Sequence, residues 1–350
     1  MDEAGHRAPH SVSRRTIVVA IVLVVVVATG LLLLLGKAAG YREVFDALEG
    51  ASASWLVACL VLEVTAYAGY TVALRAVVAM DGGPRFTPMI ATRVWLASLG
   101  ATRIVSPAGA GGVAIIYWLL RRAGMRARVA ISRVLGFNVL IFSVFGIGAF
   151  ASALALVAGA GEGVPLGMAL PWIIGVPVIA IAGLWVSQGS RGRRIAGTTA
   201  HGWWRRTAAA AVGAIIVARS TATPGRINVV ALTASVVYWL ADVACLWGAL
   251  RAIGADVSLI GVALAYATAY IAMLVPLPTG GYGAIDAAAT FTLTVLGIPL
   301  AEAVAGVVVW RFFNFWLPTI PGLVELARAG NLGRHLADDY AGGTSGVRTP

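Results

Sequence analysis

Long apolar runs with few charged residues alternate with short polar segments along most of the chain. A helix needs about 20 residues to cross the hydrocarbon core of a bilayer. Uninterrupted runs of about that length lie at Thr16–Leu35, 53–79, 134–159, 168–187, 228–250 and 301–327. With two further interrupted runs, the pattern predicts an all-α polytopic integral membrane protein with about eight helical segments.

The two interrupted runs cover 87–120 and 257–297. Proline and glycine break the first at Ser106–Gly112, and Pro276–Asp286 breaks the second. These residues free backbone groups that hydrocarbon cannot satisfy, so such a break must be buried in protein or line a wet cavity. We predict two broken, re-entrant hairpins. A loop outside the membrane joining two full crossings is the alternative for either one.

Charge placement predicts the topology. Basic residues concentrate in 1–15, in a cluster at 121–133, in the segment 188–227 and in the tail 328–350, whereas 36–52 has no basic excess. By the positive-inside rule, the basic segments and both termini are cytoplasmic, which requires each interrupted run to return to the side it entered from. Within 188–227, the short apolar stretch Ala208–Ala218 predicts an interfacial helix. We interpret Thr16–Leu35 as an uncleaved first span rather than a signal peptide.

The two hairpins share a spacing that suggests an internal repeat. Pro107 precedes Gly111 and Gly112 by the same offsets at which Pro276 precedes Gly280 and Gly281. Each hairpin lies between two spans, and the charge bias orients the units 36–187 and 228–327 oppositely. This is the inverted repeat of secondary transporters, whose substrate sites lie where the repeats meet. Chance recurrence in a chain with 42 glycines is the alternative.

Ionisable residues inside the apolar runs are costly unless paired or hydrated, so they indicate candidate sites. They are Glu63, Arg103, Asp242, Asp286 and Arg311. Arg103 and Arg311 suit a lipid phosphate because the guanidinium donates two parallel hydrogen bonds, while Asp286 would accept an ammonium group or hold an arginine. The polar side chains of Asn138, Thr279 and Tyr282 would add hydrogen bonds. Alternatively, these groups form internal pairs that only hold helices together.

Composition and motifs narrow the function classes. The chain is 59% hydrophobic and 12% charged, and its net charge of +11 belongs to span ends rather than to a nucleic-acid-binding motif. All four histidines fall in polar segments, and the sequence contains no P-loop or hydrolase motif, so we predict no metal, no cofactor and no common hydrolytic site. Cys59 and Cys245 lie in apolar runs, as packing cysteines do. An enzyme acting on lipids through Glu43, Asp46 and Glu49 is an alternative, although their spacing fits the wet face of an ordinary helix.

Several of these motifs resemble the lysylphosphatidylglycerol synthase transmembrane-region family. They are Pro276-x-Pro-x-Gly-Gly-x-Gly with Asp286 three residues after its last glycine, Gly297-Ile298-Pro299, Trp310-Arg311, Ser106-Pro107-Ala-Gly-x-Gly-Gly and Arg121-Arg122-Ala-Gly124. The resemblance covers about 40–328 and implies a lipid-flippase function. Asp286 stands where the family usually has Glu, and Asn138 stands where an acidic residue is common.

We therefore hypothesise a flippase-like protein of the bacterial plasma membrane that moves a phospholipid-type substrate between leaflets. Its headgroup would bind between the hairpin tips, near Pro107, Gly111 and Gly112 on one side and Pro276, Gly280 and Gly281 on the other. Anionic lipid headgroups at the arginine clusters are the predicted partners, together with a possible homo-oligomer. A membrane scaffold without transport is a further alternative, and it predicts that the polar cavity is absent or sealed.

Overall fold

The computed structural model describes residues 40–104, 110–160, 163–196, 203–221, 225–272 and 282–341. The predicted first span Thr16–Leu35 lies outside the described residues, and so do the tip residue Pro107 and the stretch from Pro276 to Gly281. In the described part, all regular secondary structure is helical, as the apolar pattern predicts.

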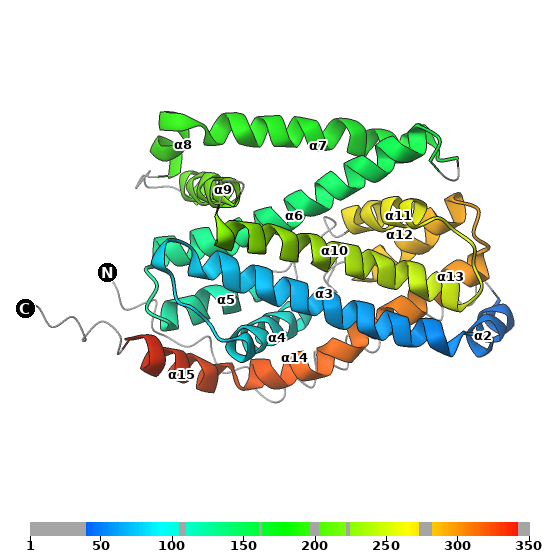
Figure 1. Cartoon of the computed structure of the whole chain (residues 1–350), viewed down its shortest axis with the longest axis horizontal. Coiled ribbons are helices and arrows are strands. Elements are labelled where there is room, and N and C mark those ends of the chain that lie inside the picture. Colours follow the sequence, from blue (N-terminus) through cyan, green and yellow to red (C-terminus); the bar gives the residue numbers. More distant parts are fainter. Residues whose placement is uncertain are drawn as a thin grey trace, which may run out of the picture.

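The helices follow the chain in the order that Figure 1 shows. They are α2 (Tyr41–Glu49), α3 (Ala53–Ala79), η2 (Met80–Gly82), α4 (Pro88–Ile104), α5 (Ala110–Arg122), α6 (Ala127–Val157), α7 (Leu166–Ser187), α8 (Gly189–Ala196), α9 (Trp203–Ser220), α10 (Arg226–Ala252), α11 (Leu259–Ile271), α12 (Tyr282–Val295), α13 (Leu300–Arg311), η4 (Phe312–Trp316), α14 (Leu317–Ala327) and α15 (Ala329–Ala341).

Five helical segments in the described part are long and apolar enough to cross a membrane: Ala53–Gly82, Ala127–Val157, Leu166–Ser187, Arg226–Ala252 and Leu300–Ala327. Each coincides with a predicted span. α6 begins seven residues before the predicted position, and the last span contains the short π-helix η4 between α13 and α14. The protein is therefore an all-α polytopic membrane protein.

The interrupted runs form helix pairs. α4 and α5 flank the first break and pack against each other, as α11 and α12 do around the second. These helices contain 17, 13, 13 and 14 residues, respectively. At about 1.5 Å per residue, each falls short of the roughly 30 Å hydrocarbon core. Whether each pair re-enters the membrane or crosses it twice stays a prediction, because the residues between the two helices lie outside the described part.

The centre of the molecule is the pair α3 and α10, which lie side by side in Figure 1. A Cβ atom on Gly69 would lie 2.8 Å from the carbonyl oxygen of Ala234, so glycine lets the two backbones touch. Further along, the thiol of Cys59 lies 3.5 Å from the carbonyl oxygen of Cys245. An earlier residue of α3, Cys59 rather than Gly69, contacts a later residue of α10, Cys245 rather than Ala234. The two helices are therefore antiparallel. Both cysteines are buried and free, as packing residues.

Segments of different charge lie at opposite ends of the long axis. In Figure 1, α4, α5, α8, α9 and α15 lie toward the left end, whereas α2, α11, α12 and the end of α10 lie toward the right. The left group contains the basic cluster at the end of α5 and the arginines of α8 and α9. α9 has 18 residues rather than the predicted eleven, and in Figure 1 it is seen nearly end-on, across the direction of α10.

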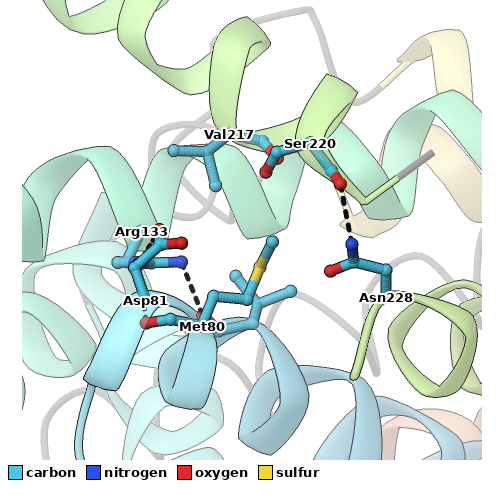
Figure 2. Close-up of polar contacts among 7 residues, drawn as sticks. Met80, Asp81, Arg133, Val217, Ser220 and Asn228 are labelled. Atoms are coloured by element: carbon cyan, nitrogen blue, oxygen red, sulfur yellow. Dashed lines mark hydrogen bonds and ion pairs between the residues drawn. The ribbon is translucent and has the colours of Figure 1, made fainter. Parts of the chain in front are cut away.

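Arg133, the last arginine of the basic cluster at 121–133, is buried between helices rather than exposed to solvent. It is buried, and its guanidinium donates to the carbonyl oxygens of Met80 at 2.7 Å and Val77 at 3.3 Å and to the carboxylate of Asp81 at 2.6 Å (Figure 2). The last carbonyls of a helix have no helical donor, so this arginine caps α3. Its partner Asp81 has a left-handed backbone conformation, with a φ of 47°.

The other contact in Figure 2 joins α9 to α10, the next helix along the chain. The amide of Asn228, at the start of α10, donates to the carbonyl oxygen of Ser220, the last residue of α9, at 2.9 Å. Val217 on α9 packs where a Cβ on Gly136 of α6 would lie, 2.5 Å from its Cγ1. α9 is therefore held against both α6 and α10.

We expect Arg133→Ala to lower the free energy of unfolding by about 2–3 kcal/mol, because buried carbonyls at the end of α3 lose their charged donor. Arg133→Lys should lower the free energy of unfolding by a smaller amount, since an ammonium still donates to the carbonyls but cannot reproduce the planar fork. The exposed Arg128 on the same helix is the matched control. Thermal unfolding of the purified protein in mild detergent checks this. Equal unfolding temperatures for Arg133→Ala and Arg128→Ala would contradict the capping role.

Candidate functional site

A cavity of about 180 Å³ lies where the helices that flank the two Pro/Gly interruptions meet. Arg103 and Gly112, close to the first break, line one part of it, and Tyr270 and Ile285, near the second break, line another. The remaining lining residues are Tyr67, Tyr70, Trp95, Ser98, Leu99, Thr102, Val113, Ile116, Asn138, Ile141, Phe142, Tyr238, Trp239 and Asn314. The cavity has room for several waters or a small headgroup but not for acyl chains.

Seven of the 18 residues that line the cavity are aromatic. The rings of Tyr67 and Trp95 lie 4.6 Å apart, and Tyr70 meets Tyr238 edge to face at 5.3 Å. Trp239 contacts Tyr238 at 4.7 Å. Packed rings of this kind hold a fixed shape, and their faces attract cations.

Arg103 supplies positive charge to this wall. Its guanidinium is buried and stacks 3.9 Å above the ring of Phe315 in the last span. Gly112 faces the same helix, where a Cβ would lie 2.6 Å from the hydroxyl of Thr102 and 2.7 Å from that of Ser98. Glycine is therefore required for α5 to approach α4 next to the cavity. Gly111 is also buried in α5 but does not line the cavity.

Asp286 and Arg311 form an ion pair between α12 and α13, next to the cavity. The arginine side chain is 7% exposed and that of Asp286 is 23% exposed. Arg311 also stacks on Trp310 at 4.2 Å and lies 3.5 Å from the amide oxygen of Asn314. Two of the sequence-predicted site residues are thus brought together, and the second hairpin is attached to the last span through them.

The π-helix η4 has a local cause. Pro318 has no N–H, so in a regular helix the carbonyl oxygen of Asn314 would lack its donor. The hydroxyl of Tyr67 donates to that oxygen at 3.0 Å and to the carbonyl oxygen of Phe313 at 3.2 Å. Short π segments within helices are frequent at functional sites. This one presents Asn314 to the centre of the protein.

Asn314 joins two buried acids. Its amide nitrogen lies 3.0 Å from Oδ1 of Asp242 and 3.3 Å from Oε1 of Glu63. Asp242 also accepts a hydrogen bond from Trp310 Nε1 at 3.0 Å and from the Tyr266 hydroxyl at 2.6 Å. Among the salt bridges of the described residues, none involves either acid. Neutral donors bind both acids, and Arg311 lies close enough to Asp242 to interact with its charge.

The structure thus unites most of the predicted site residues that it describes. Arg103, Gly112 and Asn138 line the cavity, and Asp286 and Arg311 lie beside it. The amide of Asn138 donates within its own helix, to the carbonyl oxygen of Val134 at 2.9 Å. Only the backbone of Tyr282 is described, as the first residue of α12. Thr279, Pro276, Gly280, Gly281 and Pro107 lie outside the described residues.

Sequence reasoning missed Asn314 and the aromatic wall. Asn314 is the one polar residue of the run Phe312–Trp316, followed closely by Pro318 and Pro321. An amide within an aromatic run of a span, four residues before a proline, is a signal that could have identified it. The wall combines rings from helices that are far apart in sequence, so only the packing reveals it.

The acids of the enzyme hypothesis lie apart from this cavity. Glu43, Asp46 and Glu49 are all exposed on α2, whose buried Val44 packs against Val304 and Ala305 of α13. This is the arrangement of an ordinary amphipathic helix. None of these acids lines the cavity.

Five helices that are long and apolar enough to cross a membrane define a multi-pass protein embedded in the membrane. The chain belongs to the lysylphosphatidylglycerol synthase TM region family, whose sequence model matches residues 17–322. The match includes all the cavity-lining residues, Asp286 and Arg311, and it confirms the resemblance read from the Gly/Pro motifs. Among curated individual proteins, none matches the chain significantly.

Proposed function

We propose that the protein translocates a phospholipid-type amphipathic substrate between the leaflets of the bacterial plasma membrane. The observation that carries this proposal is the cavity between the helices of the two predicted hairpins, with Arg103 in its wall and the Asp286–Arg311 pair beside it. A phosphate headgroup would enter the cavity, where a guanidinium is its best partner, while the acyl chains stay in lipid.

The arrangement of helices supports an inverted repeat. Exchanging α3 with α10, α4 with α11, α5 with α12, and α6 with the last span carries one set of helix contacts onto another. For example, α4 packs on α14 as α11 packs on α6, and α5 packs on α6 as α12 packs on α13. Together with the antiparallel α3 and α10, this favours two oppositely oriented units that rock about the central cavity.

The sorting of charge supports the proposed topology. We place the end of the molecule with the basic clusters, α8, α9 and α15 in the cytoplasm, with both termini, and the end with α2 outside. Arg126, Arg128 and Arg193 are exposed there, where they would contact anionic headgroups. α7 has exposed apolar side chains along its length, which would face lipid or a second copy of the chain.

A leaflet assay in reconstituted vesicles tests the function. A headgroup-labelled phospholipid is placed in both leaflets, and a membrane-impermeant quencher reports how fast the inner pool reaches the outside. We expect wild-type protein to accelerate this exchange and Arg103→Gln to reduce it about tenfold, the equivalent of roughly 1.4 kcal/mol of lost interaction. Arg128→Gln, which removes an exposed arginine away from the cavity, is the control and should match wild type.

The alternatives predict different results. Exchange no faster than in protein-free vesicles would contradict the translocator and favour a scaffold. Transfer of a lipid-linked sugar that depends on Glu43, Asp46 and Glu49 would favour the enzyme. Unaltered exchange in Arg103→Gln, with an active wild type, would contradict the role given to the cavity.

A further inference from the structure

Glu63 and Asp242 are the most deeply buried acids of the described residues, with 1% and 0% of their surface exposed, respectively. Both accept from the same amide nitrogen of Asn314, so the two carboxyl groups lie close together. Two like charges at such a distance in the membrane interior repel strongly, and the cheapest relief is to protonate one of them. The question is which acid binds the proton.

Hydrogen bonds distinguish the two acids. Asp242 accepts from Tyr266, Trp310 and Asn314, and three donors stabilise an ionised carboxylate. Glu63 accepts through Oε1 alone, and its Oε2 is buried without a hydrogen-bond partner among the described residues. The hydroxyl of Tyr67 lies close to Glu63 and donates to backbone carbonyls of η4. An oxygen that receives no donor is the one that a proton can occupy at least cost.

The charge balance of the centre agrees with this assignment. Asp286 is paired with Arg311, and Arg103 provides a second guanidinium near the cavity. With Asp242 ionised and Glu63 protonated, the acids and arginines of the centre balance. Among the described residues, the titratable and charged groups around Glu63 are Cys59 and Tyr67 of its own helix, Tyr238, Asp242 and Cys245 of α10, Tyr266 of α11, Asp286 of α12, Arg311 of α13 and Arg103 of α4.

We propose that Glu63 is a proton-binding site in the membrane interior, where it carries one exchangeable proton on Oε2 beside the ionised Asp242. The proton comes from water and returns to water. Asn314 links this site to Arg311 and hence to Asp286, so a headgroup that displaces the Asp286–Arg311 pair would disturb the amide that holds Glu63. Coupling of proton release to headgroup passage rests on the function proposed above, whereas the protonation of Glu63 does not.

Infrared difference spectroscopy of the purified wild-type protein tests the site directly. At neutral pH we expect a carbonyl stretch of a buried carboxylic acid that is lost in Glu63→Gln and retained in Asp256→Asn, the control at an exposed acid. Glu63→Gln should unfold at the wild-type temperature because the amide imitates the protonated acid. Asp242→Asn should unfold earlier, since its amide oxygen can still accept from Trp310 and Asn314 but its new N–H groups face the Tyr266 hydroxyl that donates to Asp242. A band that is absent from the wild type, or that persists in Glu63→Gln, would overturn the proposal.

The coupling is tested in vesicles with an imposed pH gradient. We expect the gradient to accelerate lipid exchange severalfold in the wild type and to have no effect in Glu63→Gln. Exchange that ignores the gradient in the wild type would overturn the coupling and leave the translocator standing. A Glu63-dependent infrared band in a protein that moves no lipid would instead support the proton site and contradict the translocator.

Discussion

Arg311→Ala should abolish most lipid exchange, with a loss of at least about tenfold, and should destabilise the protein by about 3–5 kcal/mol. The reason is that Asp286 would keep its charge beside the cavity without its partner. The arginine side chain that neutralises it in the wild type is almost fully buried. Asn314 would also lose the guanidinium that lies 3.5 Å from its amide oxygen. The leaflet assay and thermal unfolding, applied to the same preparation, measure the two effects.

Two variants separate charge from geometry. Arg311→Lys keeps a cation beside Asp286, so it should fold nearly as well as the wild type, but a lysine cannot hold Asp286 and Asn314 in one plane, and exchange should stay low. Arg251→Ala removes the same kind of ion pair at the surface, where Asp256 is exposed and Arg251 is partly exposed. It should cost less than about 1 kcal/mol and leave exchange unchanged. If Arg311→Ala behaves like Arg251→Ala, the pair has no role at the site.

Gly100→Ala is expected to disrupt the packing of the first hairpin on the last span. A Cβ at Gly100 would lie 2.3 Å from the carbonyl oxygen of Gly322 and 2.6 Å from its carbonyl carbon. Because backbone atoms cannot rotate away, α4 and α14 would have to separate, at a cost of about 1–3 kcal/mol or more. The separation would also strain the ion pair of Arg93 with Glu325, which joins the same helices at 2.9 Å. We expect a lower unfolding temperature and less monodisperse protein.

Gly148→Ala is the matched control. Gly148 lies within α6, and a Cβ there would meet no atom within 4 Å. Alanine has the higher helix propensity, so this variant should be as stable as the wild type or slightly more so. Size-exclusion profiles and unfolding curves of the two variants, made side by side, decide the matter. Equal behaviour would mean that the contact between Gly100 and Gly322 does not restrain these helices.

The spans and breaks of the fold could be predicted from the sequence because they depend on local chemistry. A bilayer requires about 20 apolar residues for a crossing, and proline and glycine interrupt a helix wherever it lies. The predicted spans 53–79 and 228–250 accordingly agree with α3 and α10 to within two residues. Helix ends depend less on composition, so the start of α6 at Ala127 was missed. Its basic first turns were assigned to the cytoplasmic cluster at 121–133, before the span, although Arg133 is buried against α3.

Part of the candidate site could be predicted from the sequence. Charges inside apolar runs identified Arg103, Asp286, Arg311, Glu63 and Asp242 because burial of each is costly wherever the chain places it. Which charge pairs with which depends on how the helices cross. Asp286 pairs with Arg311, while Asp242 is held by Tyr266, Trp310 and Asn314, and no spacing along the chain indicates this.

The amino-acid order was enough to establish a multi-pass helical protein and to predict its two broken hairpins, since hydrophobic length and helix breakers act over a few residues. The aromatic cavity, the contacts at Gly69 and Gly100, and the shared amide of Asn314 required the packed structure. Each of them joins residues more than a hundred positions apart. Such contacts arise because helices in a membrane associate through close backbone approach and buried polar groups, and these interactions depend on where two surfaces meet.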